Sequence, residues 1–270
     1  MKPSIIAAAV TAALIWSTAA TTPLTAQSGV SPARGPRMAD GHPDLSGVWW
    51  RGADVGGRTA SGGSVTAPAG GRGATPPPTF ASLYQPSAVA KAKTLSDKDD
   101  PALGCVSTAF GTLNVSLFDV GAVGQIVQTP KFVIMLAETY NGFQIIPTDG
   151  RPHRDNIPPS NRGDAIGRWE GDTLVVDKTN FTDTSWISAE GRVSFHSDAL
   201  HIVERYRRVD ANTLEVEATL EDPKVLTKQW IVPKQTLQLA PFDQIMELAC
   251  SGSETLSLIE GAAKQTAGKN

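Results

Sequence analysis

The chain contains only two cysteines, Cys105 and Cys250, and neither belongs to a C-x-x-C or a Cys/His spacing. The absence of such a spacing argues against a zinc centre built on these residues. The net charge is −3 and the basic residues form no cluster, which argues against a nucleic-acid partner because phosphate binding needs a concentrated Lys/Arg face. The chain also has no G-x-S-x-G elbow and no glycine loop followed by lysine. These absences disfavour the nucleophilic serine hydrolases and the phosphate-loop proteins.

The N-terminus carries the pattern of a secretory signal peptide. A positively charged Lys2 precedes an apolar run over residues 5–16, and small residues follow around Ala20 and Ala26. The run is too short to remain as a membrane anchor. We expect residues 1–26 to be removed, leaving a periplasmic or secreted protein with no membrane span after cleavage.

Two later stretches lack the large apolar side chains that a core requires. Residues 27–42 are rich in Ser, Pro, Gly and Arg and predict a disordered tether, while residues 51–78 are rich in Gly, Ala and Pro and predict a long mobile loop. The folded domain is expected to cover residues 43–255, with a C-terminal tail over residues 256–270.

The rest of the chain reads as strands joined by turns, with one short helix expected over Ser87–Leu95. The first strand starts in the segment from Pro43 to Trp50, which contains a G-x-W like that of lipocalins. The other expected strands are Ile126–Thr129, Lys131–Tyr140, Phe143–Pro147, Arg168–Glu170, Thr173–Thr179, Leu200–Val209, Thr213–Glu221, Gln229–Leu239 and Gln244–Cys250. This pattern predicts an all-β fold, a single antiparallel meander closed into a calycin or lipocalin-like barrel with room for one small ligand.

Four motifs carry a resemblance to known proteins. They are Pro43-Asp-Leu-Ser-Gly-Val-Trp49, Thr148-Asp-Gly-Arg-Pro-His153, Gly167-Arg-Trp-Glu-Gly-Asp-Thr-Leu-Val-Val-Asp177 and Ser197-Asp-Ala-Leu-His-Ile-Val-Glu-Arg205. The chain resembles, over roughly residues 43–250, a large group of secreted bacterial proteins. The resemblance implies secretion and one shared domain, and it implies no reaction.

Four residues are candidates for acid–base chemistry. Glu138 continues the strand face of Phe132, where apolar surroundings would raise the pKa of a carboxyl group toward the range useful for proton transfer. His153 follows a rigid Gly-Arg-Pro turn in a long loop, and Asp155 lies close enough in the chain to orient its ring. His201 lies in a strand between two apolar neighbours. We expect Glu138, His153 and His201 to converge on one cavity, because isolated burial of each would be costly.

Further residues are candidates for binding the substrate. Arg205, with His201, would hold a polar or anionic part of a ligand, and the tryptophans would form an apolar wall. The set consists of Tyr140, Arg151, Trp169, Trp186 and Arg205.

The favoured function is a cofactor-independent acid–base enzyme, a lyase, hydratase or isomerase that acts on a small, partly apolar or cyclic molecule in the barrel. A non-enzymatic ligand carrier and a structural envelope module are the alternatives. A divalent metal on His153, His201 and Glu138 or Asp155 is a further alternative, since two histidines and one carboxylate form a known ligand set.

The cysteines generate the first testable prediction. In an oxidising compartment we expect Cys105 and Cys250 to form a disulfide. Peptide mapping of the exported protein without reductant should yield one linked pair of peptides containing both residues, and reduction should release them. Two separately alkylated cysteines in the unreduced sample would contradict the prediction.

Overall fold

The computed structural model describes residues 35–50, 78–111, 123–138, 142–187 and 193–246, all within the unit formed by residues 33–270. The signal peptide, most of the loop over residues 51–78, the C-terminal tail, Tyr140 and Cys250 lie outside the described residues. Among the described residues, no helix is both long and apolar enough to cross a membrane.

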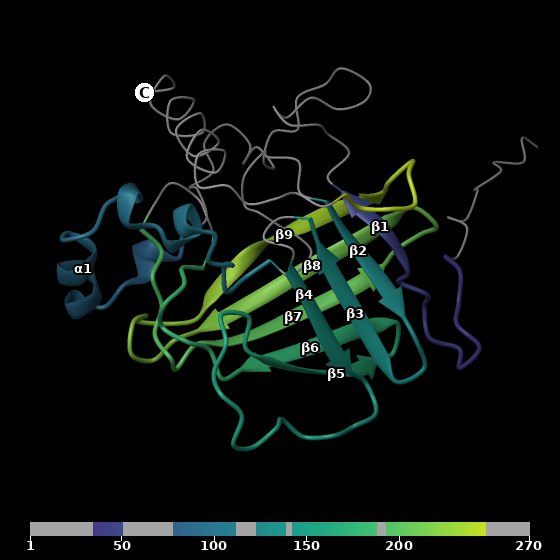
Figure 1. Ribbon diagram of the computed structural model, residues 1–270. Helices are drawn as coiled ribbons and strands as arrows, with labels where there is room; N and C mark the ends of the chain where they lie inside the picture. Colours follow the sequence, from purple (N-terminus) through teal and green to yellow (C-terminus); the bar gives the residue numbers. More distant parts are fainter. Residues whose placement is uncertain (1–34, 51–77, 112–122, 139–141, 188–192, 247–270) are drawn as a thin grey trace, which may run out of the picture. The chain divides into compact units, whose positions relative to one another are not determined.

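The fold is a nearly closed, barrel-shaped antiparallel sheet of nine strands in the order β4-β3-β2-β1-β9-β8-β7-β6-β5 (Figure 1). The all-β barrel prediction is therefore confirmed. The strands are β1 Gly47–Trp50, β2 Val123–Gln128, β3 Phe132–Ala137, β4 Gly142–Pro147, β5 Asp164–Glu170, β6 Thr173–Thr179, β7 His201–Arg208, β8 Thr213–Glu221 and β9 Trp230–Leu239. The short helical elements are η1 Ala81–Leu83, α1 Pro86–Ala92, η2 Asp97–Asp99 and η3 Pro101–Gly104.

Most predicted strands are present with shifted ends. The predicted helix corresponds to α1, and β8 buries Leu214, Val216, Ala218 and Leu220 as expected from their alternation. The predicted last strand over residues 244–250 is not found in its described part, because residues 244–246 have no strand pairing.

Residues 35–42 are ordered, so the prediction of a disordered tether through residue 42 is wrong for this part. Arg37 forms a bidentate ion pair with Asp172 in the turn between β5 and β6, at 2.7 and 3.0 Å. His42 stacks on Trp169 with ring centroids 4.6 Å apart and an interplanar angle of 7°. Ring stacking and charge thus replace the missing apolar side chains as the means of ordering this segment.

The core is divided into two apolar clusters at the two ends of the barrel. One contains Trp49 on β1, Met135 on β3 and Leu174 on β6. The other contains Phe80, Trp186 and Trp230 and is covered by the segment that includes α1 (Figure 1). Trp49 donates a hydrogen bond from Nε1 to the carbonyl of Leu45 at 2.9 Å, which satisfies its polar atom in the core.

A polar layer lies between the two clusters. Lys178 on β6 and Glu204 on β7 point into the barrel, are 0 and 1 % exposed, and form an ion pair with Nζ 3.4 Å from Oε1. Tyr206 donates its hydroxyl to the other oxygen of Glu204 at 2.8 Å. Gln144 and Gln235 add buried amides from β4 and β9. Charges buried this completely are costly unless they are paired and hydrogen-bonded, and here they are.

Asp100 generates the second testable prediction. Asp100 is 3 % exposed; one carboxylate oxygen accepts a hydrogen bond from the Ala102 amide, and the other is buried with no hydrogen-bond partner among the described residues. Burial raises its pKa from 3.8 to about 6, the Ala102 bond opposes this, and Asp97 adds to it. Because the folded pKa is raised, the contribution of protonated Asp100 to stability is lost as the pH rises through about 6.

The Asp100→Asn variant keeps the acceptor for Ala102 and removes the charge. Its free energy of unfolding at pH 8 should therefore exceed that of the wild type by about 1 to 2 kcal/mol after solvent screening. The difference should vanish below pH 3.8, the ordinary value. Urea denaturation across this pH range measures it, with Asp155→Asn, which removes an exposed carboxylate on another loop, as the control. A destabilised Asp100→Asn protein at pH 8 would refute the account.

Candidate functional site

The connection between β4 and β5 positions a histidine against the outside of the barrel. Its start is held by an ion pair in which Arg151 donates from Nε to Asp149 at 2.8 Å across Gly150, whose φ is 81°. Its end is fixed by Gly163 at a φ of 70°, where an added Cβ would lie 2.5 Å from the carbonyl oxygen of Thr179. Only glycine allows the loop to approach β6 so closely. The loop thereby brings His153 over β5 and β6.

His153 lies between two carboxylates. Its Nδ1 is 3.0 Å from Asp164 Oδ2 and its Nε2 is 3.0 Å from Asp177 Oδ1. Asp164 begins β5 and is 3 % exposed, while Asp177 lies on β6 with its side chain 24 % exposed. Both ring nitrogens of His153 are therefore occupied by acceptors.

Asp177 also holds the second histidine. His201 begins β7 and places its Nε2 3.1 Å from the same oxygen, Asp177 Oδ1. Its other nitrogen, Nδ1, is 3.8 Å from Glu221 Oε2, which is outside hydrogen-bond distance. One carboxylate oxygen thus links the loop histidine to the strand histidine.

The hydrogen bonds constrain the protons. A carboxylate accepts only, so each ring nitrogen bonded to one must carry a hydrogen. His153 donates to both carboxylates at once only when both of its ring nitrogens carry a hydrogen. His201 needs a hydrogen only on Nε2, which leaves Nδ1 able to accept a proton. Of the two rings, His201 has the nitrogen that is open for chemistry.

Asp164 is the most strongly held carboxylate of this site. It accepts bonds from the Arg154 amide at 3.1 Å, from Arg154 Nε at 2.7 Å and from His153. Burial of the carboxyl group opposes ionisation, but these bonds outweigh it and lower the pKa of Asp164 below 3.8.

The structure brings together two of the three residues expected to converge. His153 and His201 share Asp177, whereas Glu138 accepts a hydrogen bond from the Met246 amide at 2.8 Å. Among the described residues, no hydrogen bond or ion pair joins Glu138 to either histidine. Glu138 lies just past the end of β3, on the side of Phe132, whereas Val133, Met135 and Ala137 form the face of β3 that is buried in the core.

The histidines lie on the outer face of the barrel and not in its interior. On β7 the even-numbered Ile202, Glu204 and Tyr206 are buried inside, so His201 and Arg205 point out. The expected shared cavity inside the barrel is therefore wrong for these residues. Periodicity shows which residues share a face, but it does not show which face is inside when each face carries both apolar and charged side chains.

Asp155 does not orient His153. It is exposed in a turn, and Asp164 and Asp177 make the contacts expected of it. Both are distant from His153 in the chain, so local spacing could not identify them. The available signal was weak: Asp177 is a charged residue at the end of the apolar run from Leu174 to Val176.

The expected substrate-binding residues are spread over the molecule. Arg151 lies with its guanidinium carbon 5.4 Å from the ring centroid of Phe132, and Arg205 forms an ion pair with Glu170 at 2.5 Å. Trp169 stacks on His42, and Trp186 is 5 % exposed in an apolar cluster.

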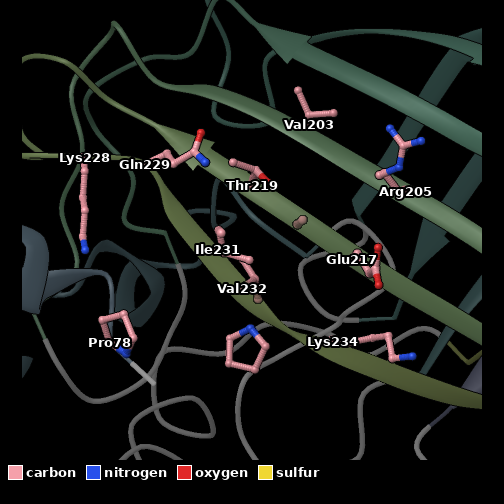
Figure 2. A pocket seen from close by; sticks show the side chains of 12 residues that line it. Pro78, Val203, Arg205, Glu217, Thr219, Lys228, Gln229, Ile231, Val232 and Lys234 are labelled. Carbon is pink, nitrogen blue, oxygen red and sulfur yellow. The ribbon is translucent and has the colours of Figure 1, made fainter. Parts of the chain in front are cut away.

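A groove of about 930 Å³ follows the outer face of β7, β8 and β9 (Figure 2). Val203 and Thr219, which line the groove, are register partners on β7 and β8. His201 and Glu221 are the next register pair on the same outer face. Residues two apart on a strand lie about 7 Å apart, so the groove begins next to His201. The lining residues labelled in Figure 2 are Pro78, Val203, Arg205, Glu217, Thr219, Lys228, Gln229, Ile231, Val232 and Lys234.

A second pocket of about 600 Å³ lies at the seam between the edge strands β4 and β5. It is lined by the outward side chains of Phe143 and Ile145 and by the inward side chains of Gln144 and Ala165. Gln144 donates from Nε2 to the carbonyl of Arg162 at 3.0 Å across this seam.

Within the described ranges, no group of three or more His, Cys, Asp or Glu side chains is arranged to hold a metal ion. No protein-family model, no curated protein and no solved structure matches the chain. The candidate function must therefore be argued from this geometry.

Asp164 generates the third testable prediction. A depressed pKa means that ionised Asp164 stabilises the fold fully above its ordinary value of 3.8 and that this contribution is lost as the pH falls through the lower folded value. At pH 7, Asp164→Asn should lower the free energy of unfolding by about 1 to 3 kcal/mol, because bonds from charged donors are lost.

Urea denaturation of the wild type and the variant from pH 7 to pH 2 measures the difference, which should shrink below 3.8. Asp155→Asn, which removes an exposed carboxylate of the same loop, is the matched control and should change stability by less than about 0.5 kcal/mol. An equal loss in both variants would contradict the assignment.

Proposed function

We propose that the chain is an exported acid–base enzyme of the lyase, hydratase or isomerase type, which moves protons on a small, partly apolar molecule bound in the groove over β7–β9. The observation that carries the proposal is the carboxylate-held His201, whose Nδ1 has no hydrogen bond to a described residue and lies beside a groove.

His201 would act as the base and then as the acid. Its Nδ1 accepts a proton from a C–H or O–H bond of the substrate, and Asp177 stabilises the imidazolium that forms. The same nitrogen returns the proton to another atom of the substrate or to a leaving group. His153 and Asp164 hold Asp177 in place and are positioning residues.

The groove favours a ligand with an apolar body and an anionic group. Ile231 is 65 % exposed and provides an apolar wall with Val203. Lys228 lies just before β9, at the end of the groove near the register pair His201 and Glu221. It has no ion-pair partner among the described residues. Its ammonium group is suited to an anionic part of the ligand.

A non-enzymatic carrier is the second candidate. The exposed apolar wall at Ile231 supports ligand binding without requiring chemistry. A carrier would be stabilised thermally by its ligand and would leave the ligand unchanged.

The fourth prediction tests the enzyme against the carrier. Purified exported protein is incubated with a metabolite extract, and mass spectrometry follows both depletion and product formation. His201→Gln should reduce turnover of the identified substrate by about 10²- to 10⁴-fold, since general acid–base catalysis contributes this much. The melting temperature should change little, because His201 is a third exposed.

His42→Gln, which alters a histidine away from the groove, is the matched control and should retain turnover. Asp177→Asn should lower turnover as well, because it removes the partner of His201 Nε2. Full turnover in His201→Gln would refute the catalytic assignment. Ligand-dependent stabilisation of the wild type without any product would establish the carrier instead.

A further inference from the structure

We propose that Lys178 is an imine-forming lysine that captures a small aldehyde or ketone entering through the seam between β4 and β5. This site lies inside the barrel, on the opposite side of the sheet from the His201 site.

The first support is the chemistry around Lys178. Its ammonium group is 0 % exposed and lies 3.4 Å from Glu204 Oε1, and Tyr206 donates to Glu204 Oε2 at 2.8 Å. Burial lowers the pKa of Lys178, Glu204 opposes this, and Arg162 adds to it. Burial and a neighbouring cation are the conditions that make a lysine nucleophilic near neutral pH.

The second support is the position of the seam pocket. It is lined by Gln144 and Ala165, whose side chains face the interior, although Lys178 itself is not among its lining residues. Ala165 is the register partner of Lys178, and Arg162, another lining residue, is near enough to act on its charge. Since β4 and β5 form the two edges of the sheet, no ladder of strand pairing between them is disrupted by a ligand at this place.

The lining of the pocket indicates the class of ligand. Phe143 and Ile145 are 62 and 51 % exposed and offer an apolar surface to a ring or short chain. Arg151, Arg154 and Arg162 also line the pocket and give it a basic character, with Arg151 and Arg154 paired to Asp149 and Asp164. An apolar aldehyde or ketone that carries a carboxylate combines these features.

The covalent step balances without a further reactant. The neutral amine of Lys178 attacks the carbonyl carbon, and a C–N bond forms as the carbonyl π bond breaks. Glu204 carries the two protons of the attacking amine in turn from the nitrogen to the carbonyl oxygen, which leaves as one molecule of water, giving a neutral imine. Tyr206 supports the proton transfer through its bond to Glu204. The imine is the stage at which a carbonyl compound is activated for loss or exchange of an adjacent proton.

The test is reductive trapping on the wild-type full chain. The protein is incubated at pH 7 with 4-formylbenzoate and cyanoborohydride, which reduces an imine to a stable secondary amine, and the modified lysines are identified by peptide mass spectrometry. Lys178 should be modified faster than the exposed Lys131, Lys228 and Lys234, because burial lowers its pKa and so raises its fraction of neutral amine. Benzaldehyde, which lacks the carboxylate of 4-formylbenzoate, should label Lys178 more slowly in a parallel reaction. The difference in rate measures how much that carboxylate contributes to binding.

Two variants keep the result interpretable. Phe143→Asn alters the pocket entrance and should slow labelling of Lys178, whereas Val127→Asn alters an exposed apolar side chain on β2, outside the lining of both pockets, and should not. Labelling confined to exposed lysines and the N-terminal amine in the wild type would overturn the proposal. Equal rates with Phe143→Asn and the wild type would overturn the seam route. Neither result alters the prediction for His201, so the two sites are judged separately.

Discussion

The structure depends on one constraint, the alternation of side chains on strands that must close into a barrel. On β6, Lys178 points inward and its neighbour Asp177 points outward; on β7, Glu204 points inward and His201 outward. Two neighbouring strands therefore supply the buried ion pair, and they also supply Asp177 and His201 of the histidine cluster. Because the period of a strand is two, a one-residue slip of β6 against β7 would turn Asp177 inward and Lys178 outward, which would break both sets of contacts.

The Lys178–Glu204 pair and the histidine cluster differ in their exposure to solvent. The Lys178–Glu204 pair is fully enclosed, so its charges depend on each other and on Tyr206, and the loss of one partner leaves the other charge buried. The histidine cluster lies at a surface where water reaches His153 and His201, with side chains 28 and 34 % exposed. Its parts can exchange protons with solvent, which acid–base turnover needs. Solvent access thus suits the outer cluster to proton transfer, and enclosure suits Lys178 to amine chemistry.

The sequence predicts the barrel and most of its strands because each strand carries a regular pattern between glycine-containing turns. It also predicts that His153 and His201 converge, because isolated burial of each would be costly, and the two rings do share Asp177. It does not identify Asp164 or Asp177, whose partners come from other elements. Lys178 falls within the predicted strand Thr173–Thr179, but only closure of the sheet shows that its side chain lies inside. Glu138 was misleading for the reverse reason, since its apolar neighbours on β3 are on the outer side.

The two sites are also linked through the backbone of β6. Asp177 and Lys178 are consecutive, so any displacement of β6 that lengthens the Lys178–Glu204 contact also moves Asp177 relative to both histidines. On β5, too, consecutive residues belong to the two different sites. Asp164 holds His153, and Ala165 is the register partner of Lys178 and lines the seam pocket. A ligand that separates β5 from β4 would therefore act on the position of Asp164. Closely packed strands transmit such shifts rather than absorb them. The two proposed sites therefore share strands β5 and β6 even though they face opposite sides of the sheet.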